Sequence, residues 1–343
     1  MATNPKLEFY RFKLNHKDSN FKTFKDFAID VLGGAISISN EEAFKLCFEK
    51  FMSAFHNNYA KDEKRKKAIT VIEDPKLNKH LDKKPAFSSS KSIVYGVING
   101  GSYGKERIAA DIADKKDAST INDKKAVMLY YYIFAYFPPE HNEGFFMIHS
   151  NGSDETITTI FREYIVSLFK GGSYNKPIPE QYCPKSFQDD FKKDAIIKSM
   201  IFSTSVIDDT HTQNPISSLV KQYNIKIEIA PKNAKQKIAI KSAQQLYNFF
   251  ADKFYSTGKK GIPLKEFSQT RLNTENEVSK APKVFEWNTR EHDFVPVVHL
   301  NGKVKMMADD TPDFIDLKRY CLELFENQIL NELRADNNGT KNR

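Results

Sequence analysis

The sequence of 343 residues has few cysteines and no long apolar run. Its three cysteines, Cys47, Cys183 and Cys321, are far apart and form no CxxC pair, which argues against a disulfide framework and against a zinc site built on such a pair. The longest apolar run covers residues 126–137, whereas a membrane-spanning helix needs about 18 apolar residues or more. The first residues show no basic-then-apolar signal pattern. We therefore expect a cytoplasmic protein without membrane contact.

The sequence motifs of metal and phosphate-binding sites are also missing. There is no HExxH or GxxxxGK[ST] sequence, and the eight histidines are scattered. His149, at the end of an expected strand, and His211, after an acidic pair, stand where a ligand or general base could lie, although a structural role is the simpler expectation. Asn99-Gly100 favours a tight hairpin turn over a phosphate-binding loop. We expect no catalytic residue, metal or cofactor.

Aromatic residues are abundant, with 27 Phe and 15 Tyr, and they supply enough apolar surface for packed cores. Alternating and helical spacings predict an α+β fold with mixed, mainly antiparallel sheets and amphipathic helices. The expected strands cover residues 7–14, 92–98, 126–137, 144–149, 195–206, 223–230, 284–287 and 294–306. The expected helices cover residues 21–31, 39–55, 155–170, 242–255 and 311–333, the second with a capping box at Ser39 and the last with Thr311 as N-cap.

A glycine pair and three prolines in residues 171–184 predict a boundary between two domains. The expected N-terminal α+β domain covers residues 1–175, and a basic C-terminal α+β domain covers residues 185–335. Residues 336–343 form a polar tail that we expect to be frayed.

Positive charge is concentrated in one part of the chain. Residues 191–283 hold 16 Lys and Arg against 8 Asp and Glu, while the rest of the chain has 36 of each. A one-sided field of this kind attracts polyanions, so the segment predicts binding of DNA or RNA. The alternative is that these cations are merely solvated and that the aromatic residues of the 242–255 helix form its core face. The candidate nucleic-acid-binding residues are Lys232, Lys235, Lys237, Lys241, Lys259, Lys260, Lys265 and Arg271.

An acidic pair offers an alternative reading as a metal-dependent nuclease. Asp208, Asp209 and Glu228 could hold Mg²⁺ in the manner of a PD-(D/E)xK site, which also needs a lysine to steady the attacking hydroxide. Ala230 stands where that lysine belongs, which counts against the reading. A third alternative is a protein-interaction subunit that meets an acidic partner.

The C-terminal helix has more apolar surface than one packing contact requires. On a regular helix its apolar side chains cover an arc of about 220°, whereas a packed helix needs a stripe only somewhat over 100° wide. We expect the side formed by Leu322, Phe325 and Ile329 to dock on a second copy, another protein or the other domain.

The order of elements in residues 90–235 resembles uncharacterised bacterial proteins of anti-phage defence gene clusters. The features concerned are the aromatic strand, Pro138-Pro139, the strand at 144–149, the helix at 155–170 and the basic segment. This resemblance implies a cytoplasmic role near phage or host nucleic acid, and it carries over no catalytic residue.

Overall fold

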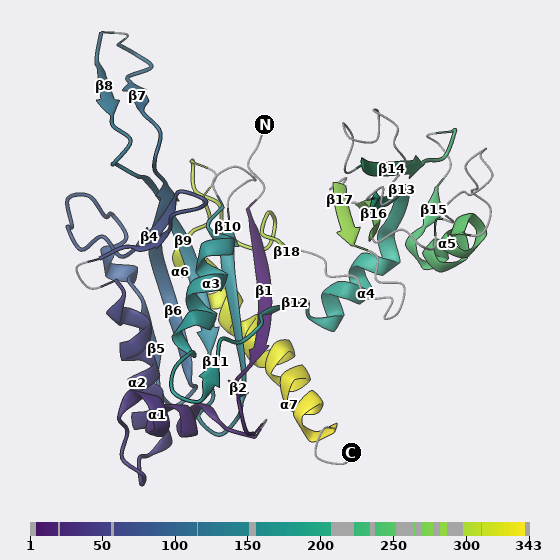
Figure 1. Ribbon diagram of the computed structural model, residues 1–343. Coiled ribbons are helices and arrows are strands. Elements are labelled where there is room, and N and C mark those ends of the chain that lie inside the picture. Colours follow the sequence, from purple (N-terminus) through teal and green to yellow (C-terminus); the bar gives the residue numbers. More distant parts are fainter. Residues whose placement is uncertain are drawn as a thin grey trace, which may run out of the picture. The chain divides into compact units, whose positions relative to one another are not determined.

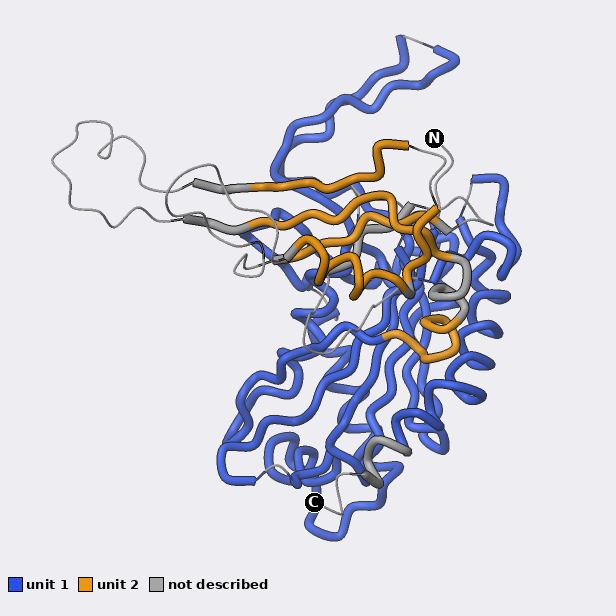
Figure 2. The backbone as a smooth tube through the Cα atoms, turned by 90° about the vertical axis from the view of Figure 1, so that its right-hand side faces the viewer, with its two compact units in different colours: residues 1–182, 297–343 blue, residues 183–296 orange. Residues whose placement is uncertain are grey.

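The structure is a computed structural model of an α+β chain that divides into two compact units (Figure 2). Unit 1 consists of Met1–Tyr182 and Val297–Arg343, and unit 2 of Cys183–Pro296. No helix among the described residues is both long and apolar enough to cross a membrane. The structure describes residues 5–19, 21–55, 58–114, 116–150, 156–206, 223–233, 237–251, 264, 269–276, 282–286, 298–309 and 311–339.

The division corrects the expected C-terminal domain. Its last part, from residue 297 onward, belongs to unit 1, because strand β18 (Val298–His299) pairs with the first long strand of the chain. The break between Tyr182 and Cys183 falls within the stretch 171–184. Independent folding of two domains stays a prediction.

Unit 1 is built on a nine-stranded antiparallel sheet. Its central strands are long, and residues that are distant in sequence meet in it: Lys6 of the first strand lies opposite Ser150. The path through the sheet is β12 (Glu180–Tyr182), β1 (Lys6–Lys13), β10 (Glu143–Ser150), β9 (Val127–Tyr136), β6 (Ile93–Ser102), β4 (Lys67–Thr70) and β3 (Ala60–Asp62), with β18 beside β1 and β5 (Ala86–Ser88) beside β6.

Helices cover both faces of this sheet (Figure 1). On one face, Phe12 packs against Phe24 of α1 (Phe24–Leu32) and Phe146 against Phe161 of α3 (Thr158–Leu168). On the other face, Phe145 packs against Phe325 in the C-terminal helical segment. Because neighbouring residues of a strand point to opposite faces, every residue of β10 is buried. The same burial explains why β9 is a continuous apolar run, as expected of a strand covered on both sides.

The predicted hairpin turn at Asn99-Gly100 is wrong, because β6 continues straight through it to Ser102. The glycines here allow close packing instead of a turn: a Cβ on Gly101 would lie 1.7 Å from the carbonyl oxygen of Val127. Asn99 is buried, and its side-chain oxygen accepts from the Ile72 amide at 2.9 Å.

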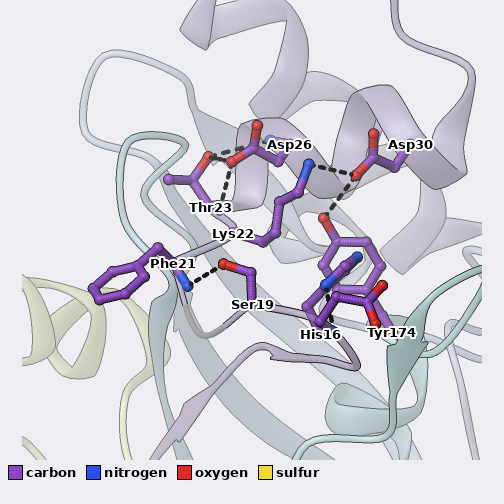
Figure 3. Close-up of polar contacts among 9 residues, drawn as sticks. His16, Ser19, Phe21, Lys22, Thr23, Asp26, Asp30 and Tyr174 are labelled. Atoms are coloured by element: carbon purple, nitrogen blue, oxygen red, sulfur yellow. Dashed lines mark hydrogen bonds and ion pairs between the residues drawn. The ribbon is translucent and has the colours of Figure 1, made fainter.

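The first two helices begin where local capping chemistry places them. Ser39 and Glu42 form the expected capping box of α2 (Asn40–Ser53), and Thr23 and Asp26 form a second one at α1. Figure 3 shows the surroundings of the second box, where the Tyr174 hydroxyl donates to Asp30 at 3.0 Å. His16, in the same view, packs edge-on against Tyr174, because β2 (Asn15–His16) pairs with β11 (Tyr174–Asn175). Through these contacts β2 and β11 pack against α1.

The C-terminal helical segment differs from the expected regular helix. Asp313, rather than Thr311, caps α6 (Phe314–Leu324), since its carboxylate accepts from the amides of Ile315 and Asp316. A π-helical turn, η4 (Phe325–Ile329), follows and leads into α7 (Leu330–Gly339), which continues into the tail expected to be frayed.

The expected docking side of this segment is wrong for two of its three residues. Phe325 and Ile329 are 2% and 0% exposed within the chain itself, and the Phe325 ring lies 5.0 Å from that of Phe134. The apolar surface that seemed surplus on a regular helix is thus covered by the chain itself at these two positions, and Phe325 lies against the sheet.

Unit 2 contains a smaller antiparallel sheet in the order β14 (Tyr223–Ile229), β13 (Ala195–Val206), β16 (Gln269–Asn276) and β17 (Pro282–Glu286), with β15 (Ile238–Ala239) beside β13. The turn η2 (Ile240–Ser242) leads into α5 (Ala243–Ala251), and α4 (Lys185–Asp194) precedes β13. The sequence predicted β13 and β14 correctly and missed α4 and β16. β16 has one strongly apolar residue, Leu272, between Thr270 and Thr274, so its alternation was overlooked.

Candidate nucleic-acid interface

The two faces of the unit 2 sheet have different chemistry. On the inner face, Ile197, Met200 and Phe202 of β13 belong to an apolar core that Leu246 of α5 joins. A β-bulge between Ile197 and Ser199 shifts the alternation by one residue. The outer face of β13 therefore carries Ser199, and strand alternation places Ser203 on it as well.

A polar network joins three strands on the outer face. The Ser199 hydroxyl donates to Glu228 Oε1 on β14 at 2.6 Å. Asn273 Nδ2 on β16 lies 2.8 Å from Ser199 Oγ and 3.4 Å from Glu228 Oε1. These contacts hold the exposed carboxylate of Glu228 in a fixed position across the sheet.

Three cations surround this network. Lys226 is exposed and lies opposite Ser203, and Arg271 is half-buried opposite Ile201. Lys198 at the bulge is exposed and forms an ion pair with Glu275 at 3.3 Å. Arg271 was among the residues predicted from the sequence, whereas Lys198 and Lys226 were not, because strand pairing and the β-bulge decide which face they share.

Of the remaining predicted basic residues, Lys232 and Lys237 are exposed on the chain that follows β14. Lys241 lies in η2, with its side chain outside the described part. Four further lysines lie outside the described residues, so the structure does not place them: Lys235, Lys259, Lys260 and Lys265.

Of the three nuclease residues, the structure describes Glu228 alone. Asp208 and Asp209 lie outside the described residues, and so does His211. Glu228 lies opposite Ile201, and β13 continues for five residues from there to Val206. The described residues contain no group of three His, Cys, Asp or Glu that could hold a metal ion.

The aromatic residues of α5 mainly serve the core. Tyr247 and Phe250 pack against it, and the Tyr247 ring lies 5.8 Å from that of Phe202. Phe249 is 54% exposed, so it is the described aromatic residue of α5 that a nucleic-acid base could reach.

His149, the other histidine singled out by the sequence, has a structural position. It is fully buried in unit 1, and its ring lies 6.1 Å from that of Phe314 of α6. A group without solvent access is poorly placed to act on a large substrate.

The described clefts of unit 1 include one of about 450 Å³ beside β1. Both signs of charge line it: Lys13 lies 3.8 Å from Glu143, and Arg11 lies 3.4 Å from Glu180. Because each of these cations lies close to a carboxylate, this cleft does not favour a polyanion.

No protein-family model, curated protein or solved structure matches this chain. The case for a function therefore rests on the residues of the outer sheet face and on the basic segment around it.

Proposed function

We propose that unit 2 binds DNA or RNA without strong sequence preference, as a component of a cytoplasmic assembly. The observation that supports this is the excess of cations in residues 191–283, of which Lys226 and Arg271 lie on the outer face of the sheet and Lys232 is exposed just beyond β14. Lysine and arginine neutralise phosphates, and hydroxyl and amide groups bind phosphate or sugar oxygens. The resemblance to anti-phage defence proteins is the basis for proposing that such binding serves bacterial defence.

The salt dependence of binding tests the proposal. If about five phosphates are contacted, log K falls with log salt at a slope near −4 to −5 for duplex DNA. The measurement is fluorescence polarisation of labelled DNA and RNA between about 50 and 200 mM salt, after bound nucleic acid has been removed by a high-salt wash.

A pair of charge reversals locates the surface. Lys226→Glu with Lys232→Glu should weaken binding roughly 60-fold at 0.1 M salt and reduce the slope by about two, since each lost phosphate contact is worth about 0.9 log units. The matched control, Lys17→Glu with Lys64→Glu, changes the charge equally on exposed sites of unit 1. Equal losses in both pairs would reject the surface.

A second variant addresses the basic segment as the sequence defines it. Reversal of Lys235, Lys237, Lys259 and Lys260 to Glu should abolish binding while the far-ultraviolet circular dichroism stays unchanged. Unchanged affinity would limit the interface to the sheet face.

The same protein samples distinguish the two alternatives. We expect no cleavage of nucleic acid, because Ala230 takes the place of the required lysine. Cleavage that needs Mg²⁺ and disappears with Asp208→Ala plus Glu228→Ala would establish the nuclease instead. Stable co-purification of an acidic protein, together with no nucleic-acid binding, would favour the interaction subunit.

A further inference from the structure

A two-stranded arm projects from unit 1 between its two longest strands. β6 and β9 pair as far as Ser102 and Val127, and the chain between them forms a separate ribbon of β7 (Arg107–Ala110) and β8 (Ala118–Ile121). Both views show this ribbon extending beyond the rest of unit 1 (Figures 1 and 2).

The arm is fixed at its base and closed at its tip. At the base, the Gly104 amide donates to the Asp123 carbonyl at 2.7 Å, and the Tyr103 amide donates to the Lys66 carbonyl at 3.0 Å. At the tip, the Asp111 amide donates to the Asp117 carbonyl at 2.8 Å. The ribbon is thus a formed element with a defined direction.

The apolar side chains of the ribbon are exposed to an unusual degree. Ile108 is 76% exposed and Ile112 is fully exposed. An isolated two-stranded ribbon is marginally stable in water. Protein edges are normally protected by charged residues or proline, yet residues 108–110 and 118–121 contain neither. Ile108, Ala110, Ala118 and Thr120 share one face by register, which makes that face flat and largely apolar.

Charge changes sign along the arm. The base, residues 103–107 and 121–125, has four cations and two anions, whereas the tip, residues 111–117, has three anions and two cations. The stretch between them is neutral. Two such arms laid antiparallel would set the acidic tip of each beside the basic base of the other. The same surface thus carries both halves of a complementary pair, as a two-fold interface requires.

We propose that the arms of two copies of this chain pair antiparallel about a two-fold axis near Ala110. The pairing would bury the Ile108 face of each arm and shield strands that no charged residue or proline protects. It joins the protein to a second copy of itself through a surface other than the C-terminal segment, whose Phe325 and Ile329 are already buried. Dimerisation does not depend on the nucleic-acid interface of unit 2.

The first test is the mass of nucleic-acid-free protein by light scattering between about 1 and 100 µM at low salt. We expect a concentration-dependent dimer. Ile108→Lys should weaken it at least tenfold, because the charge is buried twice in each dimer. Ile36→Lys, at a site in unit 1 that is 91% exposed, is the matched control. A wild type that is monomeric throughout, or equal loss in both variants, would overturn the proposal.

A charge exchange tests the antiparallel arrangement. Asp117→Lys at the tip and Lys124→Asp at the base should each weaken the dimer severalfold, because each places like charges together twice. The two variants mixed, or both changes in one chain, should restore it. Loss without restoration would reject the tip-to-base pairing.

Cross-linking provides an independent check. All three native cysteines are buried, so Ala110→Cys introduces an accessible thiol near the proposed axis. It should form a disulfide-linked dimer on mild oxidation, whereas Ile36→Cys should form no disulfide-linked dimer. The nucleic-acid variant Lys226→Glu with Lys232→Glu should dimerise like the wild type, so failure of either proposal is seen separately.

Discussion

Truncation of Phe325 to alanine should destabilise unit 1 strongly. The side chain belongs to the π turn η4, is 2% exposed, and packs on Phe134, Tyr136 and Phe145 with ring centroids 5.0, 4.9 and 6.1 Å away. Removing a ring from such a position leaves a cavity against β9 and β10 that these paired strands cannot close. Phe→Ala changes of this kind cost about 3–5 kcal/mol.

The matched comparison is Leu322→Ala, one helical turn earlier. Leu322 is half-buried, so it should cost about 1–2 kcal/mol. With an m-value of about 3 kcal/mol/M in urea, the Phe325 change corresponds to a midpoint shift of roughly 1–1.7 M, and the Leu322 change to roughly 0.3–0.7 M.

Two measurements assign the effect to unit 1. Urea unfolding followed by far-ultraviolet circular dichroism gives the midpoints, and amide hydrogen exchange of peptides from β9 and β10 should speed up in Phe325→Ala, while peptides from β13 should not change. If Leu322→Ala cost as much as Phe325→Ala, or if β9 kept its protection, the segment would not pack as the structure shows.

Three further changes test local features of unit 1. Ser39→Ala removes the hydroxyl of the α2 capping box and should cost about 1 kcal/mol in thermal unfolding. Gly101→Ala should cost about 3 kcal/mol, roughly 6–12 °C in Tm, because its Cβ would meet the Val127 carbonyl oxygen and open the β6–β9 ladder. Burial, and after it two neighbouring lysines, lower the pKa of His80 in the folded chain. As the pH drops below about 6.5, the unfolded chain therefore takes up a proton at His80 more readily than the folded chain, and the stability of the fold should fall. His80→Gln should reduce this loss in thermal melts between pH 5 and 8.

The strands of unit 1 could be predicted from sequence where both local pattern and tertiary burial agreed. Residues 126–137 and 144–149 are too apolar for solvent and bounded by Pro138-Pro139, so a buried pair was the natural inference, and β9 and β10 confirm it. At Asn99-Gly100 the local sequence pattern and the tertiary packing conflict. Local turn chemistry favoured a hairpin, whereas the close approach of β9 requires glycine in a straight strand.

The candidate site could be predicted only in outline. Charge counting identified the basic segment, because composition needs no fold. The network of Ser199, Glu228 and Asn273 depends on strand pairing between residues up to 74 positions apart, and single-sequence patterns do not set that register. Asn273 was hidden for a second reason, since β16 buries threonines where stronger apolar residues would have marked a strand.

The arm and the C-terminal segment show why apolar residues alone do not identify an interaction surface. On a regular helix, Phe325 and Ile329 seemed surplus, yet the chain itself buries both, with Phe325 packed on the sheet. Ile108 and Ile112 stand in a polar stretch for which the sequence predicted no interaction surface, yet both are exposed on a ribbon. What distinguishes the two cases is whether the chain itself covers the side chain. Exposure alone does not single out the arm, since Ile36 is also exposed; the uncharged strands and the change of charge sign along the arm are what support the proposal that it binds a second copy.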